Sequence, residues 1–176
     1  NSRSALETEG KGAQRRDPGA SGVLRLADCN SSIAGKMQRA EKRLRTPLIS
    51  AAELALHLSA PDWFVADCWF DLGKPEAGAL AWRAGHIPGA VHVDLERDLS
   101  APVTPATGRH PLPSAEDFAQ TLSRLGIGNG TLVVCYDAGP GAYAARLWWM
   151  LRWMGHEAVA VLDGGLAAWT AEGNAG

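Results

Sequence analysis

Cysteine is scarce in this chain of 176 residues, which carries thiols only at Cys29, Cys68 and Cys135. No Cys-x-x-Cys pair and no Cys/His ligand spacing occurs, so the sequence argues against a structural zinc site. We therefore expect neither a bound metal nor another cofactor. An odd and sparse cysteine count fits a reducing compartment, from which we expect a cytoplasmic protein.

Long apolar runs and an excess of basic charge are also missing. Hydrophobic residues make up 46% of the chain, which is enough for a core, yet no run approaches the length of a membrane span. Residues 1–46 carry ten Lys or Arg against five Asp or Glu, whereas residues 47–176 carry seven against fourteen. The larger segment is therefore acidic, and we expect neither a nucleic acid nor a membrane among its partners.

Residues 1–46 lack hydrophobic periodicity and are rich in Gly, Ser, Arg and Ala. This composition predicts a disordered tail, or a segment foreign to the native protein, ahead of one domain over residues 47–176. An organelle transit peptide is the alternative, against which the acidic residues Glu7, Glu9, Asp17 and Asp28 argue.

Strand and helix patterns alternate from residue 47 onward. Ser50 and Glu53 form a capping box that opens a helix through Leu58, and Ser114 opens another helix that Gly126 ends. The other predicted elements are strands over 63–67, 90–93, 132–136 and 158–162, a short helical piece within 71–85, helices over 142–154 and 166–172, and a proline-rich loop over 100–113. This alternation predicts an α/β fold, a three-layer sandwich with a mainly parallel central sheet.

The segment Asp137–Ala142 is a short Gly-rich loop between a helix and an apolar strand whose sequence predicts a central place in the sheet. Ligands of such folds bind at the carboxyl ends of the strands, and a helix N-terminus attracts anions. A catalytic thiolate would suit the first loop position, because the positive end of a helix lowers the pKa of a thiol. Asp137 stands there instead, so the scaffold suits sulfur chemistry but lacks the sulfur.

Three segments together resemble the rhodanese family. Trp82–Val91 contains Gly-His-Ile-Pro-Gly-Ala and is similar to the family's His-Ile-Pro-Gly-Ala element. Val134–Gly141 resembles its active-site loop, and Leu162–Trp169 resembles its closing Asp-Gly-Gly element. The order and separation of the three make the match specific, and the resemblance covers residues 47–176.

The resemblance is closer still to the first half of two-domain thiosulfate and 3-mercaptopyruvate sulfurtransferases, through Tyr136-Asp137, Gly108–Pro113 and Ala144–Leu151. It implies that this chain is a degenerate first domain and that a second rhodanese domain, missing from the sequence, supplies the nucleophilic Cys. The implied reaction moves sulfane sulfur from a small anionic donor, thiosulfate or 3-mercaptopyruvate, to cyanide or a thiol through a Cys persulfide. The chain alone would then be inactive.

The resemblance also implies roles for three residues outside this loop. Residues matching Glu96 and His110 face the partner domain's Cys in mercaptopyruvate sulfurtransferases, and a His polarised by a carboxylate suits proton transfer. Arg109 is a candidate for binding an anionic substrate or an interdomain carboxylate. The alternative is a polar loop that only packs at the interface.

The remaining candidates are predicted to be structural. Asp137 should accept hydrogen bonds from N–H groups of the loop, which Gly139 and Gly141 shape, and of the helix. His86 should bond to the backbone of its turn. Arg146 should pair with Asp137 or another acid of the loop.

Two further features concern the strand before the loop and the helix after it. Cys135 lies inside the strand, two residues before the loop, so we expect it to be buried rather than nucleophilic. Trp148, Trp149 and Trp153 mark an apolar helix that should pack on the sheet and, in part, against a second domain.

The sequence leaves two other functions to compare with sulfur transfer. The first alternative is a stand-alone, inactive rhodanese-like module that serves in binding or regulation. A phosphatase loop of the Cys-x5-Arg type is disfavoured, because Asp137 replaces the Cys and neither Ala142 nor Tyr143 is an Arg.

Overall fold

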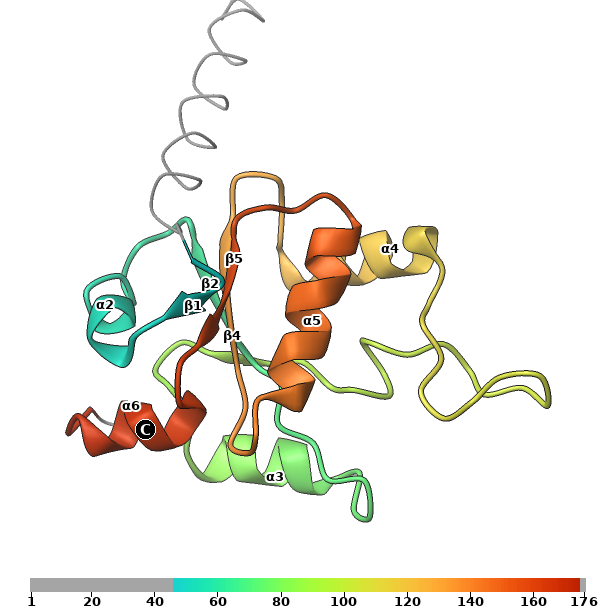
Figure 1. The fold of residues 1–176 in the computed structure, drawn as a ribbon, viewed down its shortest axis with the longest axis horizontal. Coiled ribbons are helices and arrows are strands. Elements are labelled where there is room, and N and C mark those ends of the chain that lie inside the picture. The colour runs from blue at the N-terminus through green and yellow to red at the C-terminus, as the bar shows by residue number, and fades with distance from the viewer. Residues whose placement is uncertain (1–45, 175–176) are drawn as a thin grey trace, which may run out of the picture.

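The computed structural model describes residues 46–174 (Figure 1). Except for Thr46, the predicted tail over residues 1–46 lies outside the described residues. The strands are β1 (Leu48–Ile49), β2 (Trp63–Asp67), β3 (Val91–His92), β4 (Leu132–Tyr136) and β5 (Val159–Leu162). The helices are α2 (Ala51–Ala55), α3 (Ala77–Ala84), α4 (Ala115–Leu125), α5 (Ala142–Trp153) and α6 (Gly165–Ala171).

The five strands form one sheet in the order β1-β5-β4-β2-β3, and every pairing is parallel. β4 is the central strand, as its uninterrupted apolar sequence predicted, and all five of its residues are buried. The predicted α/β fold with a mainly parallel sheet is therefore confirmed, and the described sheet is parallel throughout. This topology brings the loops after β2, β3 and β4 to one edge of the sheet.

Helices cover both faces of the sheet and enclose two cores. In Figure 1, α4 and α5 lie on one face, whereas α2 and α6 lie on the other. Val133 and Cys135 of β4 pack into the core beneath α4 and α5. Val134 and Tyr136 alternate with them and pack into the core beneath α2 and α6. The described part of the chain is thus the predicted three-layer sandwich.

The predicted helix caps are found in the structure, but one helix is shorter than predicted. The Ser114 hydroxyl accepts the N–H of Asp117 at 3.1 Å, and Gly126 ends α4 with φ at 78°. Ser50 likewise caps α2, but this helix ends at Ala55 rather than at Leu58. Tight turns follow it, closed by bonds such as His57 N–H to the Leu54 carbonyl at 2.9 Å. Strand β1 was not predicted, because two residues are too few for a periodicity signal.

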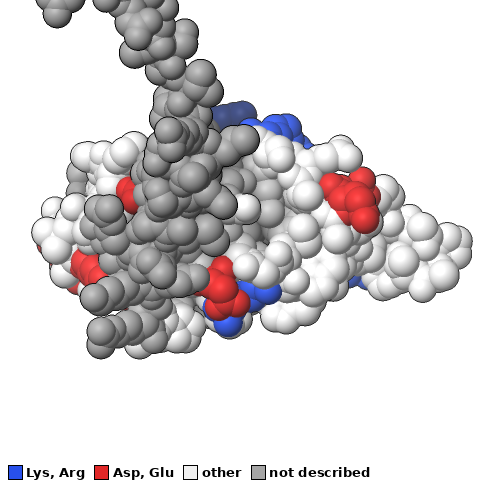
Figure 2. All heavy atoms as spheres, turned by 90° about the horizontal axis from the view of Figure 1, so that it is seen from above, with Lys and Arg blue, Asp and Glu red and all other residues white. Residues whose placement is uncertain are grey.

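No described helix has both the length and the apolar character that a membrane crossing requires. On the face shown in Figure 2, basic and acidic side chains of the described residues are scattered among uncharged atoms.

Candidate functional site

The carboxylate of Asp137 fills the loop between β4 and α5. Its Oδ1 accepts the N–H groups of Gly139 and Gly141, each at 2.9 Å. Its Oδ2 accepts the N–H groups of Tyr143 and Ala144, each at 3.1 Å. The side chain is buried, with 1% exposure. Asp137 thus satisfies two orphan donors of the first turn of α5, where negative charge also meets the positive helix end, as the sequence predicted.

Two further segments close over this loop. The Asp137 carbonyl accepts the N–H of Leu166 at 3.1 Å, which joins the Asp-Gly-Gly element to the loop. A Cβ on Gly165 would stand 2.4 Å from that carbonyl oxygen, so only glycine allows this approach. A Cβ on Gly139 would stand 2.8 Å from the Trp69 ring. The loop is therefore held closely on two sides, next to a pocket of about 340 Å³.

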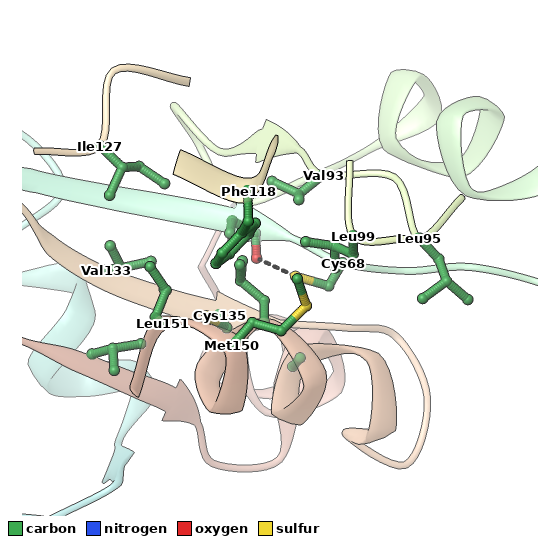
Figure 3. Close-up of a cluster of buried hydrophobic side chains, with 14 of the residues drawn as sticks. Cys68, Val93, Leu95, Leu99, Phe118, Ile127, Val133, Cys135, Met150 and Leu151 are labelled. Atoms are coloured by element: carbon green, nitrogen blue, oxygen red, sulfur yellow. Dashed lines mark hydrogen bonds between the residues drawn. The ribbon is translucent and has the colours of Figure 1, made fainter. Parts of the chain in front are cut away.

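Cys135 does not provide a replacement nucleophile. Its exposure is 0%, and it lies in the core beneath α4 and α5 together with Cys68 (Figure 3). A hydrogen bond with Cys135 and full burial raise the pKa of the Cys68 thiol well above its usual value. Both cysteines are free thiols. The predicted burial of Cys135 is confirmed, and neither sulfur has access to the loop's N–H groups or to solvent.

A second group of polar residues gathers beyond strand β3. Nε2 of His110 lies 3.3 Å from Oε1 of Glu96, and both residues line a pocket of about 570 Å³. The His110 side chain is 12% exposed, whereas that of Glu96 is 49% exposed. Phe70 meets the imidazole edge to face, with the ring centroids 5.8 Å apart. The two residues chosen from the resemblance are thus in contact, although 14 positions separate them in sequence.

Arg109 lines the same pocket. Its Nη2 donates to the Leu72 carbonyl at 2.6 Å, and within residues 46–174 no carboxylate forms an ion pair with it. A guanidinium has five N–H donors, so this side chain retains donors for an anion.

Within the described part of the chain, no group of three or more His, Cys, Asp or Glu residues is placed to hold a metal ion.

Comparisons with known proteins agree with this geometry. The family model of the rhodanese-like domain matches residues 50–172. The chain belongs to the rhodanese-like family. Over 128 residues, this rhodanese-like domain is 53% identical to a probable 3-mercaptopyruvate sulfurtransferase of Pseudomonas aeruginosa, covering 72% of this chain and 45% of that protein. It is 49% identical over 142 residues to the human 3-mercaptopyruvate sulfurtransferase, covering 74% of this chain and 45% of that protein.

Solved structures give the same fold. The crystal structure of SseA from Escherichia coli, a 3-mercaptopyruvate sulfotransferase, superposes with a TM-score of 0.66 at 36% identity, covering 74% of this chain and 49% of that one. The 3-mercaptopyruvate sulfurtransferase of Leishmania major also gives 0.66, at 32% identity, covering 74% and 36%. The chain spans less than half the length of these relatives.

The predicted partner of Arg146 in the rhodanese-like domain is wrong. Arg146 does not pair with Asp137 or with any other acid of the loop. Its Nη2 donates instead to the carbonyls of Leu99 at 2.8 Å and His110 at 2.9 Å, and Nε also faces Leu99 at 3.3 Å. The physical reason is that four backbone N–H groups already satisfy Asp137, and the guanidinium bonds instead to the carbonyls of the segment that lies across it.

The turn around His86 is built as predicted. Nδ1 of His86 lies 2.7 Å from the carbonyl of Trp82, and its ring stacks on the indole of that residue at 4.6 Å. The next residue, Ile87, donates its N–H to the hydroxyl of Tyr136 at 3.2 Å. The His-Ile-Pro-Gly element therefore braces the end of β4.

Sequence reasoning missed two acids, Asp94 and Asp98, that bond to the segment carrying Glu96 and Arg97, two of the residues that line the His110 pocket. Asp98 is buried and accepts bonds from Arg97 and Arg124 at 2.7 Å each. Asp94 accepts the N–H groups of Glu96 and Arg97 at 2.9 and 2.8 Å. The charge-dense segment over residues 94–98, directly after a strand, was the signal that could have drawn attention to them.

The tryptophans of α5 only partly face the sheet. Trp149 and Trp153 are 46% and 45% exposed and stack on each other with centroids 6.1 Å apart. Packing of this helix on β4 and β5 runs through Ala144, Leu147, Met150 and Leu151. The expectation that the tryptophans also pack against a second domain stays a prediction.

Proposed function

We propose that this chain is the non-nucleophilic rhodanese domain of a sulfurtransferase, and that a second rhodanese domain in the same protein provides the reactive Cys. The parent reaction moves sulfane sulfur from thiosulfate or 3-mercaptopyruvate to cyanide or a thiol through a Cys persulfide. The observation that carries the proposal is the Asp137 carboxylate, buried at the nucleophile position and bonded to four backbone N–H groups.

The chemistry of Asp137 excludes it from covalent sulfur transfer, because a carboxylate has no sulfur on which a persulfide forms. Cys135 is buried and has no access to the loop. In this proposal the nucleophile lies outside the described residues. The relatives, named as sulfurtransferases, are more than twice as long as the matched part of this chain, which leaves room for a second domain.

The pocket around His110 is the part of this domain that we propose to face the partner's Cys. In this proposal His110, in contact with Glu96, transfers a proton to or from the reacting sulfur or its leaving group. Arg109 binds the anionic donor through its remaining N–H groups. The polar character of the pocket and its volume of about 570 Å³ are compatible with such a small anion.

The free thiols also give an indication of the cellular compartment. Cys68 and Cys135 are adjacent in the core and remain unlinked. Unlinked cysteines are usual in a reducing compartment, so we propose a cytoplasmic location.

An activity assay on this chain tests the first half of the proposal. We expect no thiosulfate:cyanide and no 3-mercaptopyruvate:thiol sulfur transfer above background from the wild-type chain. The Cys135→Ser variant is the matched control. Turnover in the wild type that this variant abolishes would show that Cys135 is the nucleophile and would overturn the proposal.

Restoring a thiol tests the geometry of the loop. In Asp137→Cys, the N–H groups at the start of α5 should stabilise a thiolate, so iodoacetamide should alkylate it at pH 7 at least about tenfold faster than an ordinary cysteine, whose pKa is about 8.5. Asp137→Ser is the control for background labelling. Alkylation at the rate of an ordinary thiol would show that the loop does not favour an anion at this position.

The coding sequence beyond Gly176 tests the second half of the proposal. A frame that continues into a second rhodanese domain, with Cys at the position matching Asp137, supports it. A stop codon directly after Gly176 refutes it and favours a stand-alone binding or regulatory module.

A further inference from the structure

Arg146 is a half-buried cation that has no acidic partner within the described residues. It lies on α5, one turn after the Asp137 loop. Burial lowers the pKa of its guanidinium, and no ion pair with a carboxylate compensates within residues 46–174. Its donors go instead to two backbone carbonyls, those of Leu99 and His110. Because Arg146 binds carbonyls and no carboxylate, an ion pair does not explain why this cation is partly buried.

The two carbonyls lie at the two ends of one loop. Leu99 precedes the proline-rich loop over 100–113 and His110 lies near its end, and the Ala101 N–H donates to the Pro111 carbonyl at 2.9 Å. Arg146 Nη2 also lies 3.4 Å from the Ser100 hydroxyl. The guanidinium therefore holds both ends of the loop against α5, through residues 99, 100 and 110, of which Ser100 and His110 also line the pocket.

The backbone of His110 explains why this anchor matters. His110 has φ at 54°, and among residues 46–174 it is the non-glycine residue with positive φ. A side chain rarely adopts this left-handed conformation unless its surroundings hold it there. The bond from Arg146 to the His110 carbonyl fixes the peptide plane, and with it the direction in which the imidazole leaves the backbone.

We propose that Arg146 is the positioning residue that holds the His110 imidazole against Glu96. The proposal rests on the proposed function, in which His110 transfers a proton. Arg146 touches neither the pocket nor the substrate. It acts through the His110 carbonyl, so that the ring stays 3.3 Å from Glu96 and edge-on to Phe70. Through α5, it also links the inactive loop to the polar pocket.

This role requires the shape of the guanidinium and not only its charge. Two of its nitrogens reach two carbonyls from one rigid plane, whereas a lysine ammonium is a single point of charge on a flexible chain. Arg146→Lys keeps the charge and removes the planar fork, and Arg146→Gln removes both. Arg152→Gln is the matched control, because Arg152 lies on the same helix and pairs with the exposed Glu157.

Nuclear magnetic resonance of the chain tests the positioning directly. In the wild type and in Arg152→Gln, we expect a nuclear Overhauser contact between the rings of His110 and Phe70. We expect this contact to disappear in Arg146→Lys and in Arg146→Gln, while the amide signals of the Asp137 loop stay in place. Persistence of the ring contact in either variant overturns the proposal.

A measurement on the wild type keeps the proposal testable if the variants do not fold. Bonded guanidinium protons exchange slowly with water, so the Nη protons of Arg146 should give resolved, protected signals. If those protons exchange as fast as the protons of an exposed arginine, the proposed anchor does not exist.

A double-mutant cycle on turnover in the intact protein connects the anchor with function. If Arg146 acts through His110, Arg146→Gln should reduce turnover about 10- to 100-fold in the wild-type background and should cost nothing more in a His110→Gln background. Additive losses contradict the positioning role. If His110→Gln alone leaves turnover unchanged, the proposed proton transfer fails, and the ring contact still decides whether Arg146 positions His110.

Discussion

The Asp137 loop and the His110 pocket follow the carboxyl ends of two parallel strands, yet their polar groups are arranged in opposite ways. In the loop, one buried carboxylate is bonded to four N–H groups, and glycine contacts close the segment from outside. In the pocket, Glu96 is half exposed, His110 has a single long side-chain contact with it, and Arg109 retains unbound donors. The loop therefore resembles a structural core, and the pocket resembles a site that still has bonds to make.

This difference shows what a carboxylate does at the start of a helix when it occupies the first position of such a loop. A helix N-terminus and a run of loop N–H groups leave a set of donors that must be satisfied, whether or not a thiolate is present. An aspartate meets that requirement permanently. Residues for function are then expected where polar groups remain only partly satisfied, which in this domain is the pocket.

Removing the Asp137 carboxylate should give the largest loss of stability. Asp137→Ala leaves four N–H groups without their acceptor, and we expect the free energy of unfolding to fall by about 4 kcal/mol, since each orphaned donor costs about 1–3 kcal/mol and water reaches some of them. Urea denaturation of the chain measures it. Asp163 is exposed and lines the pocket of about 340 Å³ next to the Asp137 loop. As a control, Asp163→Ala should change the free energy of unfolding by no more than about 0.5 kcal/mol. Equal effects of the two changes would mean that Asp137 is not structural.

A methyl group on the Asp-Gly-Gly element should have the next largest effect. Gly165 has φ at 56°, and a Cβ there would collide with the Asp137 carbonyl. We expect Gly165→Ala to cost about 3 kcal/mol, because backbone strain and the clash add together. Gly89→Ala is the matched control, since Gly89 has φ at 80° but open space around it, and it should cost about 1 kcal/mol. Thermal unfolding of both variants compares them, and a smaller loss for Gly165→Ala would contradict the close contact.

The sequence predicts the structure around the Asp137 loop better than it predicts the contacts of the His110 pocket. The central strand and the role of Asp137 follow from local signals, namely an uninterrupted apolar run and a Gly-rich turn into a helix. The contact of His110 with Glu96 follows only from the family resemblance, because nothing local links positions 14 residues apart. The partner of Arg146 was predicted wrongly, since a helix position indicates the direction of a side chain but not which loop folds across it.

Removing the charge of Asp98, which bonds to Arg97 beside the His110 pocket, should have an intermediate effect on stability that depends on pH. Burial favours neutral Asp98, but bonds from Arg97 and Arg124 outweigh it and hold the pKa of Asp98 below its usual value. A carboxyl with a lowered folded pKa stabilises the protein above its unfolded pKa of about 4, and this contribution disappears as the pH falls through the folded value. We expect Asp98→Asn to cost about 2 kcal/mol at pH 7.

The difference between wild type and Asp98→Asn should therefore narrow below about pH 4. Denaturation curves from pH 7 down to pH 3 measure this. Lys74→Gln, an exposed change that leaves every carboxylate in place, serves as the control. A difference that stays constant over this range would show that Asp98 contributes through packing and not through its ion pairs.

The smallest effect on stability should come from a substitution at Glu96. This substitution tests the contrast between the structural Asp137 loop and the His110 pocket. Because Glu96 is half exposed and its contact with His110 is long, Glu96→Gln should change the free energy of unfolding by less than about 0.5 kcal/mol. Turnover of the intact protein should nevertheless fall, on the order of tenfold, because the His110 ring loses the carboxylate that polarises it. The exposed Glu116→Gln on α4 should change neither quantity. A loss of more than about 1 kcal/mol with unchanged turnover would place Glu96 with Asp137 as a structural acid, and the pocket would then differ from the loop only in its exposure.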